Sequence, residues 1–403
     1  MELFWLEHKK LWRKKIVKIC VLLCFVYCVI FGSILSFQWF CFGSSDDYTS
    51  AFGNNFDGYT VIKDSQEYAL SFGGELTDET LQKIVSDYQQ MEADGMGEEL
   101  EKTDWQIVNS WLGTLYPELR DTSNYKTMIS YVDPDKLTGF YERRQQVLDE
   151  FLEVSGQVGA EKEFLHQMER KVEKPFHYEW VEGWSTLLGS MVADLGVVMA
   201  LFLGIVLSSL FAGEWHDNTS TLVLSTRNGW GKIALAKILT GLAFTVELFA
   251  LLAVSNVISQ LFFMGTAGWD MPIQNIKLIA VAPMNMLQAE IYEYAFVLLG
   301  AIGFAGIVMF ISAAVKNNVL TLLLSLAVVY GPMMIAEYLP YEMQKALDLI
   351  PLVGSSTDIF RTNTFRIFGK LIWSPYLLIT IPVLIGILCL SLIHISEPTR
   401  RRG

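Results

Sequence analysis

Two acidic side chains, Glu247 and Asp194, lie inside long apolar stretches of the sequence. An ionisable group is costly in hydrocarbon and commonly marks the path of an ion or a substrate. Glu247 falls about fourteen residues into its stretch, which at ~1.5 Å per residue places it near mid-membrane. Its carboxylate is therefore a candidate for the wall of a translocation path, or alternatively for a hydrogen bond between helices. Asp194 is a second candidate, although its position also fits the interface between the bilayer and water on the external side.

No group of residues has the spacing of a catalytic centre or a metal site. His166 and His177 have no acidic partner at ligand spacing, and the five cysteines fall in or beside apolar stretches, as packing residues do. The segment NGWGKI lacks the first glycine of a phosphate-binding loop, because Thr226 stands at that place. We therefore expect that this chain is not an enzyme, holds no cofactor or metal, and does not hydrolyse nucleotide itself.

A stripe of small residues marks one face of an expected helix. Gly196, Ala200, Gly204 and Ser208 follow each other at i, i+4 spacing. Small residues let helix backbones approach closely in lipid. The stripe predicts close packing, either inside one subunit or across a dimer axis. A leucine at Gly204 is therefore expected to disrupt assembly or transport, whereas a leucine at Val206, on the opposite face, is expected to be mild.

The elements that must position these residues follow from the composition. The chain of 403 residues is 52% hydrophobic and only 18% charged, which is too apolar for a soluble globular protein. The charges are unevenly distributed, since residues 42–183 hold 29 acidic and 12 basic side chains and the remainder has a net charge of +4. This pattern predicts an acidic soluble domain inside a membrane-embedded frame. It excludes a nucleic-acid-binding protein and a disordered chain.

A membrane-spanning helix needs about 20 mostly apolar residues, and six stretches meet that rule. The expected fold is an all-α polytopic membrane protein with a mainly helical domain between the first and second spans. The expected spans are residues 16–40, 184–211, 233–263, 294–315, 319–336 and 373–393, with an amphipathic interfacial helix at 1–15 and the acidic domain at 42–183. The remaining segments are expected to be a cytoplasmic coupling loop at 212–232, an extracellular loop at 264–293 and an extracellular helical segment at 337–372.

Basic residues on short flanking segments mark the cytoplasmic side of a membrane protein. The segment before the first span is rich in lysine and arginine, and the loops at 212–232 and around Lys316 carry further basic residues. All of these segments fall on one side of a six-span path. We therefore expect a multi-pass protein of a bacterial cell membrane with a cytoplasmic N-terminus. The acidic domain is then outside the cell, with helices expected from residue 78 and residue 137 and a last helix that continues into the second span.

The segment FAGEWHDNTSTLVLSTRNGWGKIALAKIL, residues 211–239, resembles the signature of the permease subunits of ABC type-2 (ABC-2) transporters. The family pattern has a Glu soon after the second span, a Leu-rich Ser-Thr stretch and a Lys that opens the third span. Asn218 and Arg227 depart from the Gly and Pro that are usual in the family. The residues that fit are Glu214, Thr219, Leu222, Leu224, Ser225, Thr226 and Lys237.

The resemblance implies the membrane subunit of an ATP-driven exporter. Its implied partners are a separate ABC ATP-binding subunit that hydrolyses ATP, a second copy of this or a homologous permease, and the lipid bilayer. The implied coupling segment receives the movement of the ATPase through Glu214, Thr219, Leu222, Ser225, Thr226 and Arg227. The spans hold few ionisable groups, which favours a hydrophobic or amphipathic substrate such as a drug, an antimicrobial peptide or a lipid-like molecule.

Two further interpretations of the sequence remain open. The first is a sensor or mechanotransmitter, in which ATPases move the outer domain and no substrate crosses the membrane; four spans are usual in that class. The second, a membrane-bound enzyme, lacks any candidate nucleophile or metal cluster. Separately, residues 390–400, LSLIHISEPTR, resemble the translation of a sequencing adapter, so residues 390–403 are expected to be an artefact.

Overall fold

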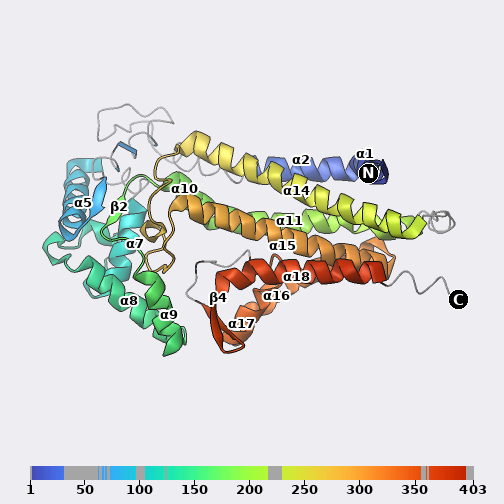
Figure 1. The fold of residues 1–403 in the computed structure, drawn as a ribbon. Coiled ribbons are helices and arrows are strands. Elements are labelled where there is room, and N and C mark those ends of the chain that lie inside the picture. The colour runs from blue at the N-terminus through green and yellow to red at the C-terminus, as the bar shows by residue number, and fades with distance from the viewer. Residues whose placement is uncertain are drawn as a thin grey trace.

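The computed structural model describes residues 2–30, 73–96, 105–121, 123–124, 126–216, 229–354 and 363–395, together with residues 62, 66, 67, 69 and 360. Over these residues the chain forms a bundle of long helices with a domain of shorter elements at one end (Figure 1). Helix α1 (Glu2–Arg13) lies at the other end of the bundle. We call the two ends the domain end and the α1 end.

Five helical stretches in the described part of the chain are long and apolar enough to cross a membrane. Their length and composition support a membrane protein. They are built from α11 (Val192–Leu207) with α12 (Ser209–His216), α14 (Gly229–Met264), α15 (Met286–Val315), α16 (Asn318–Ile335) and α18 (Ser374–Ile395).

The first expected span, residues 16–40, is described only as far as residue 30. Its described part is α2 (Lys15–Val29), which packs against α11 and α14. The face that it buries carries Val17, Cys20, Cys24 and Cys28. These residues recur at helical spacing, as expected for side chains that pack a helix against its neighbours. The described residues thus contain five candidate spans, and a sixth stays a prediction.

The segments near the spans differ from the expected boundaries. α15 begins at Met286, eight residues before the expected span at residue 294, because Asn285 forms a capping box with Gln288. Between α16 and α18, where a helical segment was expected, lie a short helix and a hairpin. These elements are η8 (Ala336–Tyr338), α17 (Tyr341–Leu347), β3 (Thr364–Ile367) and β4 (Lys370–Trp373).

The domain is mainly helical around its own apolar core. Its longer helices are α5 (Asp78–Met91), α7 (Trp105–Leu115), α8 (Phe140–Val154) and α9 (Ala160–Glu169). A two-stranded antiparallel sheet pairs β1 (Gly74–Leu76) with β2 (Phe176–Tyr178). The short helical turns of the domain are η2 (Glu92–Met96), η3 (Pro117–Leu119), η4 (Met128–Ser130) and η5 (Pro134–Lys136).

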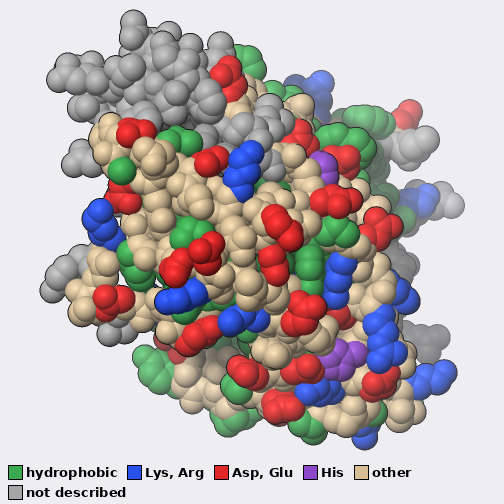
Figure 2. Space-filling model, turned by 90° about the vertical axis from the view of Figure 1, so that its left-hand side faces the viewer, with side chains coloured by type: hydrophobic (Ala, Val, Ile, Leu, Met, Phe, Trp, Pro, Cys, Tyr) green, Lys and Arg blue, Asp and Glu red, His purple; other side chains and the backbone are tan. Residues whose placement is uncertain are grey.

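The surface of the domain end is polar and rich in acids. Figure 2 shows acidic side chains spread over this face, with lysines and arginines between them. The core beneath this surface includes Leu81, Ile84 and Tyr88 of α5, at the helical spacing that the sequence predicts. Leu148 and Leu152 of α8 are also buried, but they belong to the apolar core of the bundle.

The last helix of the domain does not continue into the second span. α9 ends at Glu169, and β2, α10 (Glu182–Thr186) and η6 (Leu187–Met191) precede α11. Gly189 has non-helical dihedral angles inside η6, so the expected span at 184–211 is broken near its start. The domain is therefore joined to the bundle by a bent segment instead of one continuous helix.

Side-chain bonds fix the domain to the loop between α14 and α15, which includes η7 (Ile273–Asn275). The indole N–H of Trp180 donates to the Met264 carbonyl at 3.0 Å, and that of Trp184 donates to the Thr266 carbonyl at 3.3 Å. Buried Arg144 is ion-paired with Glu169. It also donates to the carbonyl oxygens of Leu278, at 2.6 Å, and Ala280, at 3.2 Å.

Candidate functional site at the α1 end of the bundle

A break in the second candidate span positions Glu214. The helix is interrupted at Ser208, between α11 and α12, and Ser312 of α15 fills the break. The Ser312 hydroxyl donates to the Ser208 carbonyl at 2.7 Å and accepts from the backbone N–H groups of Phe211, at 3.2 Å, and Ala212, at 3.0 Å. These bonds satisfy backbone groups that a helix end leaves unpaired. α12 is therefore a short separate helix with its N-terminus fixed to α15.

Glu214 of α12 forms a buried ion pair with Lys237 of α14. The carboxylate oxygen lies 2.8 Å from the Lys237 nitrogen, and the two side chains are 8% and 3% exposed. Lys237 also donates to the Leu210 carbonyl at 2.6 Å. Two residues of α1 complete the cluster, since Glu7 lies 3.8 Å from Lys237 and Lys10 lies 3.8 Å from Glu214. Charged atoms of three helices thus meet at this end of the bundle.

Helix α1 also binds the side chain of Glu247. The Trp12 indole N–H donates to one carboxylate oxygen at 3.0 Å, and the His8 Nε2 atom lies 3.1 Å from the other. Glu247 and Lys237 are ten positions apart, about 15 Å along α14, whereas their partners His8 and Glu7 are adjacent on α1. α1 must therefore cross α14 instead of running along it.

The exposed face of α1 is suited to a membrane interface. Leu11 is buried against the bundle, while Trp5, Leu6, Lys9 and Arg13 are exposed. Apolar and aromatic side chains beside basic ones are the composition of a helix that lies in the interface plane. An interfacial position for the helix at residues 1–15 stays a prediction.

The other predicted site residues fall into two groups. Residues 219–227 of the coupling segment, which include Thr219 and Arg227, lie outside the described residues. Asp194 is exposed in the first turn of α11. Glu247 is 43% exposed and has partners on α1. A role for either carboxylate in translocation stays a prediction.

The small-residue stripe of α11 packs inside the chain. A Cβ atom on Gly204 would lie 3.2 Å from a methyl group of Leu326 and 3.4 Å from one of Leu322, both on α16. Gly196, Ala200 and Ser208 are also buried. Val206, on the opposite face, is also buried, with 1% of its side chain exposed, and its tolerance of leucine stays a prediction.

A closer helix contact, which the sequence analysis did not find, joins α15 and α18. A Cβ atom on Gly306 would lie 2.9 Å from the Gly386 Cα atom, and one on Gly303 would lie 2.3 Å from the Pro382 carbonyl oxygen. The two backbones therefore touch along this crossing. The spacing Gly303-x-x-Gly306 in an apolar helix is the sequence signal that marks it.

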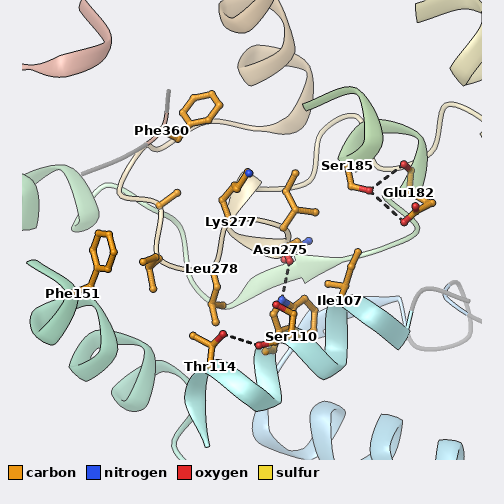
Figure 3. Close-up of a pocket in the computed structure, with 14 residues that line it drawn as sticks. Ile107, Ser110, Thr114, Phe151, Glu182, Ser185, Asn275, Lys277, Leu278 and Phe360 are labelled. Carbon is orange, nitrogen blue, oxygen red and sulfur yellow. Dashed lines mark hydrogen bonds between the residues drawn. The ribbon is translucent and has the colours of Figure 1, made fainter. Parts of the chain in front are cut away.

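The domain end contains a pocket of about 520 Å³ between α7, α8, α10 and the loop that follows α14. Figure 3 shows Phe151 and Phe360 on one side, Glu182 and Ser185 on the other, and the Lys277–Leu278 segment between them. The Ser185 hydroxyl donates to the Glu182 carboxylate at 3.3 Å. Desolvation by burial raises the pKa of Glu182, although hydrogen bonds from Ser185 and Thr186 act in the opposite direction. The walls combine apolar and polar groups, as small-molecule sites do.

The sequence analysis also missed two carboxylates at the start of α15, Glu290 and Glu293, which are both buried. It placed them in an outer loop because the apolar stretch begins only at Tyr294. The capping sequence at Asn285 to Gln288 was the signal for an earlier helix start.

Comparison of the chain with protein-family models, with curated proteins and with solved structures found no match.

Proposed function

We propose that the protein is the membrane subunit of an ATP-driven ABC exporter that works with a separate ATP-binding subunit. The observation that carries this proposal is the buried cluster of Glu214, Lys237 and Glu7, which joins α12, α14 and α1 at one end of the bundle. The resemblance of residues 211–239 to ABC-2 permeases supports it. In this proposal the α1 end is cytoplasmic and meets the ATPase.

The cluster gives a physical route for coupling. ATP binding closes the ATPase subunits and displaces the segment at residues 212–232, which includes the end of α12. Because Glu214 is ion-paired with Lys237, a displacement of α12 also moves the start of α14. The helix break at Ser208 provides the point about which α12 turns relative to α11. The long helices then change their packing and switch access between the two sides of the membrane.

The substrate is proposed to be hydrophobic or amphipathic. The pocket at the domain end supports this choice, because aromatic walls at Phe151 and Phe360 face the polar groups of Glu182 and Ser185. Its volume of about 520 Å³ lies within the range of small-molecule sites. The pocket would be the outer part of the route.

A second candidate function is mechanotransmission without transport. It is favoured by the direct hydrogen bonds from Trp180 and Trp184 to the end of α14 and by the bonds of Arg144 to the following loop. These contacts would pass a movement of α14 into the domain. ATP-dependent uptake of an amphipathic dye by inverted vesicles would favour export, and its absence despite ATP hydrolysis would favour this alternative.

The proposed function is tested by purifying the tagged full chain from the membranes of its own host. We expect a subunit with Walker motifs and ATP hydrolysis to co-purify. In the variant Glu214→Gln, which keeps a hydrogen bond to Lys237 but removes the negative charge, hydrolysis should persist while transport falls at least fivefold. Glu337→Gln, at an exposed acid near the end of α16, is the matched control and should transport normally. A folded chain that purifies without any ATPase activity would contradict the proposal.

A further inference from the structure

A group of buried polar side chains lies between α14 and α15, near their domain ends. Glu290 is 4% exposed, and neither of its carboxylate oxygens has a hydrogen-bond partner of good geometry. Gln260 is 0% exposed, and neither its amide nitrogen nor its amide oxygen is paired. The Asn256 side-chain oxygen and the Tyr294 hydroxyl are also buried without a partner of good geometry. Buried polar groups of this kind are rare and need an explanation.

The two helices direct these groups toward each other. Asn256 and Gln260 lie about 40° apart on one face of α14, at ~100° per residue. Phe249, on the same face, packs its ring 6.1 Å from that of Tyr294. The Tyr294 hydroxyl interacts with the side chains of Asn256 and Glu290. α14 and α15 are antiparallel (Figure 1). Gln260 therefore lies one turn nearer the domain end than Asn256, and Glu290 lies one turn nearer the domain end than Tyr294.

The cluster has an excess of hydrogen-bond acceptors and no basic residue beside it on its two helices. The lysines of α14 are Lys232 and Lys237, at the α1 end, and α15 contains no basic residue. Asn256 is nineteen positions from Lys237, roughly 28 Å along the helix. The Gln260 amide nitrogen and the Tyr294 hydroxyl are donors within the cluster, but no cationic group on either helix balances the Glu290 carboxylate.

We propose that this cluster binds the ammonium group of an amphipathic organic amine. An ammonium group has three N–H donors and a positive charge, which match the carboxylate and amide oxygens. A zinc or other transition-metal ion is disfavoured, because the described residues contain no group of three His, Cys, Asp or Glu side chains that could hold one. The aromatic rings of Phe249 and Tyr294 provide apolar surface for the rest of the molecule.

The position of the cluster relates it to the pocket at the domain end. α10, which carries Glu182 in the pocket wall, packs against both α14 and α15. α10 therefore connects the pocket wall to the two helices that carry the cluster. This assignment of a substrate class rests on the proposed function, whereas the binding itself needs no ATPase.

The test measures binding of dansylcadaverine, an amphipathic primary amine, to the full chain in phosphatidylcholine nanodiscs, with empty nanodiscs as background. The uncharged N-acetyl derivative is the matched probe. Tryptophan-sensitised dansyl emission reports binding. We expect the wild-type protein to bind the amine at least tenfold more tightly than the acetylated probe. Decylamine should displace the amine probe, and sodium chloride at the same concentration should not.

The variants locate the site. Glu290→Gln should weaken amine binding at least tenfold and leave binding of the acetylated probe unchanged, whereas the control Glu337→Gln should bind as the wild type does. If Glu290→Gln does not fold, Gln260→Leu provides the second test, with an expected loss of about threefold or more. Equal binding of both probes to the wild type, or full amine binding by a folded Glu290→Gln or Gln260→Leu variant, would overturn the proposal. Because no ATPase is present, that result would leave the proposed exporter function standing.

Discussion

At the scale of single residues, Lys237 is the best-connected charge at the α1 end. Its nitrogen contacts a carboxylate and a backbone carbonyl, and its side chain is almost fully buried. Removing one partner of a buried ion pair leaves the other charge without compensation, at a cost of about 3–5 kcal/mol. We expect Lys237→Ala to destabilise the protein by this amount, as measured by denaturant unfolding in detergent.

Lys10→Ala is the control for this prediction, because Lys10 contacts the same carboxylate from an exposed position at 3.8 Å. An exposed ion pair contributes less than about 1 kcal/mol. Similar losses of stability in both variants would show that the burial of Lys237 does not determine its contribution.

The residues of this site were only partly predictable from sequence. Glu214 and Lys237 were found by their resemblance to a family pattern, because their spacing along the chain fits it. Their contacts with Glu7 and Lys10 join residues more than 200 positions apart, and no local pattern reports such a pairing. Glu290 was missed for another reason: the apolar-stretch rule starts a span at the first uninterrupted apolar residues and ignores helix caps.

At the scale of the elements, helix crossings differ in how much space they leave. An added methyl on Gly306 would meet the backbone of Gly386, which cannot move aside, whereas one on Gly204 would meet flexible leucine side chains. Overpacking costs roughly 1–3 kcal/mol. We expect Gly306→Ala to lower stability by about that amount and Gly204→Ala to cost less, as measured by thermal unfolding in detergent.

Gly331→Ala is the matched control on α16, where an added Cβ atom has no neighbour within 4 Å. It should be neutral, or stabilising by up to about 1 kcal/mol, because alanine favours a helix more than glycine does. A loss of stability at Gly331 as large as that at Gly306 would show that close backbone contact is not the cause.

The sequence predicted the elements best where one pattern continues without interruption. The periodic residues of α5 and the long apolar stretch of α14 are examples. It failed where a pattern is interrupted, as at Gly189, where an apolar stretch is divided, and at Ser208, where a hydroxyl from α15 stabilises two helix ends. The break at Ser208 involves a partner elsewhere in the chain.

At the scale of the whole molecule, the charges predict its orientation in the membrane. Exposed basic residues gather on α1 and α2, and the acidic domain lies at the opposite end (Figure 1). In a variant without native cysteines, we expect Ser110→Cys in the domain to react with an impermeant thiol reagent in intact cells. Lys9→Cys on α1 should react only after permeabilisation, and the reverse pattern would invert the topology.

Helix α14 extends from the ion-pair cluster to the domain without a break, over 36 residues. At 1.5 Å per residue its length is ~54 Å, well beyond the ~30 Å thickness of a bilayer core. An unbroken helix of this length acts as a stiff lever. A tilt of only ~5° about one end displaces the other end by roughly 5 Å, which is about the rise of one helical turn. Small adjustments around Lys237 would therefore be amplified at Met264, where Trp180 of the domain is attached.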